Sequence, residues 1–225
     1  MESHCNLASA MMSFLHIPKN AGSSINQAVG VKGTNHYPLR WRGIDPRIKV
    51  DTEASIFTTI RNPYDRVMSI FYFLKKSQRH PRVLRQRKVK GRSFHRMTEF
   101  EDANDFVAKF YGDTERFRHN YNDDDRTRFM LWNTQCFYYE QINFINEADG
   151  EPISERIDKV LRFETLADDW PEFASAHGFS GLPHVNQSGL RNKRKWQDEL
   201  TPESIAKIGE LYAEDFEHLN YERIS

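Results

Sequence analysis

The stretch from Phe14 to Ser24 constrains the fold most, because it carries the signals of a strand, a tight turn and a helix in eleven residues. The mainly apolar residues over 12–17 predict a short buried strand. Pro18 ends that strand, since proline has no N–H to donate to a neighbouring strand. The run Asn20-Ala21-Gly22 then predicts a tight turn in which the glycine is free to take a positive φ.

The helix that follows this turn predicts an anion site at its start. Ser23 or Ser24 is expected to cap a helix that begins at Ile25. Backbone N–H groups and the helix dipole then point at one spot, beside the cationic side chain of Lys19. The stretch therefore predicts a site for phosphate or sulfate, and an ordinary strand–turn–helix corner is the alternative.

The order of residues in the turn distinguishes between classes of phosphate loop. The P-loop of nucleotide hydrolases, G-x-x-x-x-G-K-[ST], places its lysine after the second glycine, whereas Lys19 precedes Gly22. The run from His16 to Ser24, His-Ile-Pro-Lys-Asn-Ala-Gly-Ser-Ser, instead resembles the 5′-phosphosulfate loop of sulfotransferases that use 3′-phosphoadenosine 5′-phosphosulfate (PAPS), in particular the carbohydrate and small bacterial types. The resemblance implies that this donor is held by Lys19, Asn20, Ala21, Gly22, Ser23 and Ser24.

A second stretch strengthens the resemblance. Residues 54–60 predict another buried strand, and Pro63 is well placed in the first turn of a helix over 63–74. The sequence from Arg61 to Ser69, Arg-Asn-Pro-Tyr-Asp-Arg-Val-Met-Ser, resembles the 3′-phosphate motif of the same superfamily, R-[DN]-P-[YW]-x-R-x-x-S. Arg61 and Ser69 are therefore expected to bind the 3′-phosphate of PAPS, as a guanidinium and a hydroxyl can.

Shorter matches continue toward the end of the chain. Residues 157–163 predict a third buried strand, with a helix after it. The basic side chains of Arg191 and Lys193 are expected to close over the 3′-phosphate. The segments that resemble parts of the family are 162–166, 182–188 and 212–221.

Three more elements have local signals. Thr201 predicts an N-cap before a helix that begins at Pro202. Phe106 and its apolar neighbours indicate another helix. Residues 137–145 are aromatic and alternating, so we interpret them as a strand or as the wall of an acceptor pocket.

Together the three strands and the helices between them indicate an α/β fold. We expect a three-layer sandwich with a central parallel sheet and a P-loop-like turn that binds the phosphosulfate. Ligands of such sheets bind at the carboxyl ends of the strands, where both anion motifs lie. We expect one sulfotransferase domain over 1–225, in which a variable, helical and basic insertion over 75–133 forms the acceptor region.

The resemblance implies transfer of a sulfuryl group from PAPS to a hydroxyl or amine, which leaves 3′-phosphoadenosine 5′-phosphate (PAP). Charge builds on the leaving oxygen, and Lys19 is expected to stabilise it. His36 is the expected base, because it lies in a turn-rich segment where the family places a catalytic histidine. His184 and Glu164 are the alternatives for the base, and His16 is interpreted as structural.

The acceptor is predicted from charge alone. Ten Lys and Arg residues and no acid lie between residues 75 and 96, which favours a hydroxylated, anionic glycan. A solvated surface segment is the alternative, and acidic residues between 99 and 125 could neutralise the run. A small-molecule acceptor also stays open.

The composition limits which binding partners and which cellular compartment we expect for this protein. Thirty-two Lys and Arg balance 32 Asp and Glu, so the net charge gives no argument for nucleic acid or membrane. Two cysteines are too few for a disulfide framework or a zinc site, and no metal is expected, because cations and N–H groups can cover the phosphates of PAPS. No signal peptide is evident and no apolar run approaches the roughly 20 residues of a membrane span, so we expect a cytoplasmic protein.

Two other classes of function stay open. A nucleotide-binding kinase with a degenerate P-loop would need a metal-binding acid at the end of the second strand, where this chain has Arg61. A catalytically silent relative would bind anionic glycan through residues 75–96 without turnover.

Overall fold

The computed structural model describes residues 12–30, 36–41, 55–77, 100–110, 139–147, 152–183 and 195–224. The chain divides into two compact units, each built from two separate stretches. The first unit comprises Met1–Ile60 and Asn143–His184, and the second comprises Arg61–Ile142 and Val185–Ser225.

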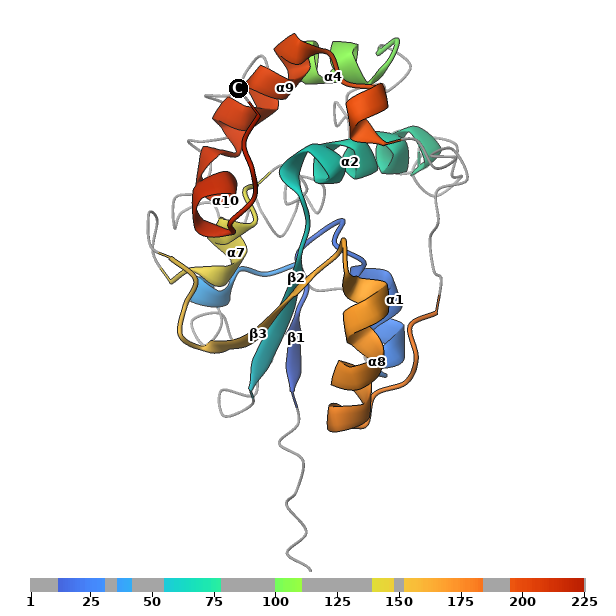
Figure 1. Ribbon diagram of the computed structural model, residues 1–225, viewed down its shortest axis with the longest axis vertical. Helices are drawn as coiled ribbons and strands as arrows, with labels where there is room; N and C mark the ends of the chain where they lie inside the picture. The colour runs from blue at the N-terminus through green and yellow to red at the C-terminus, as the bar shows by residue number, and fades with distance from the viewer. Residues whose placement is uncertain are drawn as a thin grey trace, which may run out of the picture. The chain divides into compact units, whose positions relative to one another are not determined.

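A parallel sheet forms the centre of the first unit (Figure 1). Strand β2 (Ile56–Ile60) lies between β1 (Ser13–Leu15) and β3 (Ile157–Arg162) and is parallel to both. All five residues of β2 are buried, as expected for the middle strand of a parallel sheet. The α/β class with a parallel sheet is therefore confirmed, with each strand shorter than its predicted range.

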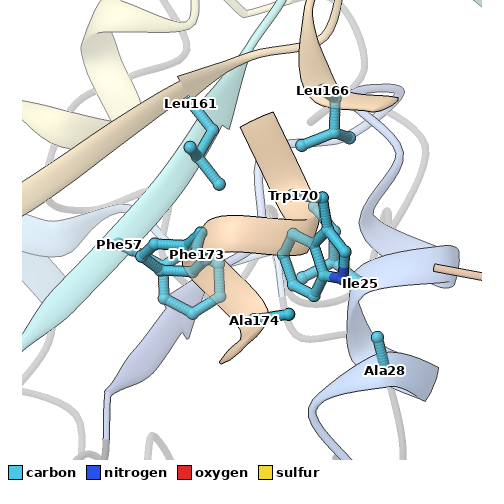
Figure 2. Close-up of a cluster of buried hydrophobic side chains, with 8 residues drawn as sticks. All are labelled: Ile25, Ala28, Phe57, Leu161, Leu166, Trp170, Phe173 and Ala174. Atoms are coloured by element: carbon cyan, nitrogen blue, oxygen red, sulfur yellow. The ribbon is translucent and has the colours of Figure 1, made fainter. Parts of the chain in front are cut away.

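Helices α1 (Gly22–Ala28) and α8 (Leu166–His177) pack against side chains of this sheet. Figure 2 shows Trp170 and Phe173 of α8 beside Phe57 of β2, and the rings of Phe57 and Phe173 are 4.9 Å apart. The segment after α8 returns to α1, where the Ser180 N–H donates to Ala28 O at 3.0 Å. This cluster fixes the position of α1, and its buried members are Ile25, Ala28, Phe57, Leu161, Leu166, Trp170, Phe173 and Ala174.

The described part of the second unit is helical. Helix α2 (Pro63–Ser77) begins where predicted, because Asn62 Oδ1 accepts from the N–H of Tyr64 at 3.0 Å and Pro63 needs no partner. Thr201 caps α9 (Pro202–Leu211) as predicted, with its hydroxyl 3.3 Å from the N–H of Ser204. The remaining elements are α4 (Ala103–Phe110), α10 (Ala213–His218) and the 3₁₀ turn η7 (Trp196–Asp198). A second 3₁₀ turn, η1 (Leu39–Trp41), belongs to the first unit.

One element differs from the prediction. Residues Ile142–Ile145 form a single helical turn, α7, and not a strand. A short alternating apolar run does not distinguish a buried helical turn from a strand. The first N–H of this turn, on Ile142, donates to the carboxylate of Asp215 at 2.8 Å. That N–H therefore does not donate a hydrogen bond to a neighbouring strand. Among the described helices, none is long and apolar enough to cross a membrane.

Candidate active site

The turn between β1 and α1 differs from the prediction in its backbone. The left-handed residues are Lys19 (φ 72°) and Ala21 (φ 65°), and Gly22 is already the first residue of α1. Ser23 and Ser24 therefore lie inside the first helical turn and do not cap it. The reason is that the left-handed Ala21 occupies the N-cap position, so the helix begins before either serine. Non-glycine residues in this conformation cost about 1–2 kcal/mol each, which surrounding contacts must offset.

Reciprocal hydrogen bonds to β2 hold the turn. Asn20 Nδ2 donates to Thr59 O at 2.8 Å, and Thr59 Oγ1 donates to Asn20 O at 2.6 Å. Both residues are fully buried. One position earlier, Thr58 Oγ1 donates to Leu15 O of β1 at 2.8 Å. The strained turn is thus fastened to the last residues of β2, directly before Arg61 in the chain.

His16 packs on the start of α1. It lies one residue after β1 and is buried, and a Cβ placed on Gly22 would lie 1.8 Å from its Nε2. Gly22 does not take the positive φ that the sequence analysis assigned to the turn glycine, and this glycine is instead required by the close approach of the imidazole. Burial, together with the charges of His36 and Lys19, holds the pKa of His16 well below its usual range.

His36 lies against the same imidazole. The ring centroids of His16 and His36 are 4.3 Å apart, with an interplanar angle of 65°. Two of the predicted site residues, Gly22 and His36, thus pack against His16 within the first unit, and the charge of a third, Lys19, acts on its pKa. His16 itself has the buried, structural character that the sequence analysis expected.

Arg61 lies in the second unit, where Asp65 orients its side chain. The guanidinium is almost fully buried, and its Nε and Nη2 lie 2.6 and 2.5 Å from Asp65 Oδ2. Ser69 follows Asp65 by four residues on α2, so the two lie on the same face of that helix. The structure therefore places the two predicted 3′-phosphate ligands, Arg61 and Ser69, along one side of the start of α2.

Two buried residues hold the backbone of Arg61. Gln141 Oε1 accepts from the Arg61 N–H at 2.8 Å, and Gln141 Nε2 donates to Arg61 O at 2.7 Å. The same Nε2 lies 3.1 Å from Asp215 Oδ2. Burial raises the pKa of Asp215. The charge of Arg66 and the hydrogen bonds from Gln141 and Ile142 act in the opposite direction and lower it. Sequence reasoning missed Gln141, for which no motif gives a signal, whereas Asp215 lies in the segment 212–221 that resembles the family.

The comparisons identify the family. Residues 9–222 match the model of the sulfotransferase family, a span that includes both anion motifs and the closing segment. The chain belongs to this sulfotransferase family. The resemblance drawn from the motifs is confirmed, and with it the general activity, transfer of a sulfuryl group. No curated protein and no solved structure matches the chain significantly.

Several predicted site residues of this sulfotransferase lie outside the described ranges. They include Arg191 and Lys193, expected at the 3′-phosphate, and the alternative base His184. The third candidate base, Glu164, is exposed and lies two residues after the end of β3. Of the predicted acceptor insertion over 75–133, the structure describes the end of α2 and residues 100–110.

Proposed function

We propose that this sulfotransferase uses PAPS as donor and transfers its sulfuryl group to a hydroxyl or amine, with His36 as the base. The observation that carries the proposal is the contact of His36 with His16, 4.3 Å between ring centroids, because His16 packs on Gly22 of the candidate phosphosulfate turn. The base would thus stand beside the loop that holds the reacting group.

The donor would be held by two groups of residues. Lys19 to Ser24 would form a P-loop-like turn around the 5′-phosphosulfate, in a three-layer sandwich. Arg61 and Ser69 would bind the 3′-phosphate, and Arg191 and Lys193 would close over it. The bonds between Asn20 and Thr59 support the role of the turn, since they hold it in one conformation within the first unit.

The reaction would be an in-line displacement at sulfur. The acceptor oxygen forms a bond to sulfur while the bond from sulfur to the bridging oxygen of the 5′-phosphate breaks. His36 takes the proton of the acceptor hydroxyl, and Lys19 stabilises the charge that develops on the bridging oxygen. The products are the sulfated acceptor, PAP and a proton on His36.

The acceptor would be a hydroxylated molecule, and we propose an anionic glycan. The support is the run of ten cations without an acid over residues 75–96, which begins in the last turn of α2 with Lys75 and Lys76. A cationic segment of this composition concentrates an anionic partner at low salt, and the attraction weakens as salt screens it.

A transfer assay tests the proposal. The protein is incubated with sulfur-labelled PAPS and a panel of desulfated polysaccharides, small alcohols, phenols and amines at several salt concentrations. We expect labelled glycan and PAP, with turnover that falls as salt rises and falls further when Arg85, Arg87 and Lys88 become alanine. Labelling confined to small neutral acceptors would overturn the glycan assignment. Tight binding of ATP with Mg²⁺ and none of PAP would overturn the use of PAPS.

A further inference from the structure

We propose that Gln141 and Asp215 are positioning residues for Arg61, and that they set the selectivity of the site for a 3′-phosphorylated nucleotide. The inference rests on the proposed function, since it takes Arg61 as the 3′-phosphate ligand. Neither residue is expected to touch the nucleotide. Their effect on binding passes through the backbone of Arg61, within the second unit.

The carboxamide of Gln141 takes the place of a neighbouring strand at Arg61. It accepts from the Arg61 N–H at 2.8 Å and donates to the Arg61 carbonyl at 2.7 Å, so one side chain satisfies both backbone groups of one residue. Gln141 is fully buried and Arg61 is 4 % exposed. Buried backbone groups require partners, and Gln141 provides them at the residue where β2 has just ended.

Asp215 fixes which way that carboxamide points. Its Oδ2 accepts from Gln141 Nε2 at 3.1 Å, and its Oδ1 accepts from the Ile142 N–H at 2.8 Å. Rotation of the amide by half a turn would set Gln141 Oε1 against the carboxylate and against the Arg61 carbonyl. The carboxylate therefore selects the orientation in which both bonds to Arg61 form.

The segment that carries Gln141 is itself anchored to α2. Arg66 is buried, and its Nη1 donates to Tyr139 O at 2.7 Å. Gln141 thus lies between two anchors, the Arg66 bond at Tyr139 and the Asp215 bond at Ile142. An anchored side chain can hold Arg61 in one backbone position, which a mobile one could not.

Arg61 is consequently held at both ends. Gln141 holds its backbone, and Asp65 holds one edge of its guanidinium through Nε and Nη2. Arginine binds phosphate through a planar set of N–H groups, so its affinity depends on how the plane is aimed. Loss of either positioning residue should therefore weaken the interaction with the 3′-phosphate and leave the rest of the nucleotide site unchanged.

Calorimetric binding of PAP and of 5′-AMP tests this inference, because these nucleotides differ only by the 3′-phosphate. The wild-type protein should bind PAP more tightly than 5′-AMP. Gln141→Leu and Asp215→Asn should each reduce that preference by about tenfold, the scale of a lost buried hydrogen bond, with AMP affinity nearly unchanged. Tyr72→Phe serves as the matched control, since it removes the Tyr72 hydroxyl bond to Glu199 in the same unit without touching Arg61.

The outcomes separate the inference from the proposed function. Equal binding of PAP and AMP by the wild-type protein would remove the 3′-phosphate assignment of Arg61, and the inference with it. A wild-type preference that survives in both folded variants would overturn the inference alone. In an Arg61→Ala background, Gln141→Leu should reduce the preference no further, because Gln141 acts through Arg61.

A measurement on the wild-type protein covers the case in which the variants do not fold. Because coupling is reciprocal, a 3′-phosphate on Arg61 should stabilise the bonds that hold Arg61. Hydrogen exchange of the Arg61 and Ile142 amides should therefore slow more with saturating PAP than with saturating AMP. Equal protection of these amides by the two nucleotides would overturn the inference.

Discussion

The imidazole of His16 packs so closely on Gly22 that the two could not coexist if residue 22 carried any side chain, since its Cβ would lie 1.8 Å from Nε2. The contact joins the end of β1 to the start of α1 across six residues. It also brings His36, which packs on the same imidazole, to the candidate phosphosulfate turn.

Gly22→Ala should destabilise the protein and weaken its binding of PAP. The new methyl group displaces His16, and overpacking of this kind typically costs about 1–3 kcal/mol. Thermal unfolding and PAP calorimetry measure the two effects. Gly181→Ala is the matched control, because a Cβ there meets nothing within 4 Å. Equal behaviour of the two variants would show that the turn adapts to a side chain.

His16 should make the protein less stable in mild acid. Its folded pKa is depressed below the unfolded value of about 6.5, so the unfolded chain binds the proton first. The stabilising contribution is therefore complete above pH 6.5 and is lost as the pH falls toward the folded pKa.

Denaturant titrations of wild type and His16→Gln between pH 4.5 and 8 check this dependence. The difference in unfolding free energy between the two proteins should shrink as the pH falls. A difference between His16→Gln and wild type that stays constant with pH would contradict the assignment.

Valine variants of two neighbouring threonines can distinguish an effect on protein stability from an effect on PAP binding. Thr58 and Thr59 are both fully buried, and each donates its hydroxyl to a backbone carbonyl, Thr58 to Leu15 and Thr59 to Asn20. Valine at either position should cost about 1–3 kcal/mol of unfolding free energy. Only Thr59→Val should also weaken PAP binding, because of the two hydroxyl bonds only that of Thr59 reaches the turn. Parallel loss of PAP affinity in both variants would assign the effect to general destabilisation.

His36→Ala should greatly reduce turnover while PAP affinity stays close to wild type, since the base touches the acceptor and not the nucleotide. The loss in kcat should be about 10²–10⁴-fold, the usual contribution of a general base. Single-turnover transfer and PAP calorimetry on the same preparation measure both quantities. Turnover at the wild-type rate would move the role of the base to His184 or Glu164.

Local signals predicted the elements well. The apolar runs gave β1, β2 and β3, and the capping residues Asn62 and Thr201 place the starts of α2 and α9 where the sequence indicates. These features depend on neighbours in the chain, so a sequence carries them directly. The left-handed conformation of Ala21 was missed, because alanine has no preference for it.

Contacts between distant residues were not predictable. Gln141 meets Arg61 across 80 positions, and Asp215 meets Gln141 across 74. No periodicity relates such residues, and a glutamine in a loop has many possible partners. The role of Gly22 was misjudged for a different reason: the neighbour that excludes a side chain there, His16, is only six residues away, but which way its ring turns is not readable from the sequence.

The order of the strands has a consequence for synthesis on the ribosome. One edge of β2 pairs with β1, which is made first, but its other edge pairs with β3, from Ile56 opposite Ile157 to Ile60 opposite Arg162. About 100 residues must be added before that partner exists, which takes about 5–20 s at ordinary elongation rates. During this interval an apolar, β-branched strand has an unpaired edge, the feature that promotes pairing between chains. Nascent chains that stall before Ile157 should therefore be the species that aggregates and depends on chaperones.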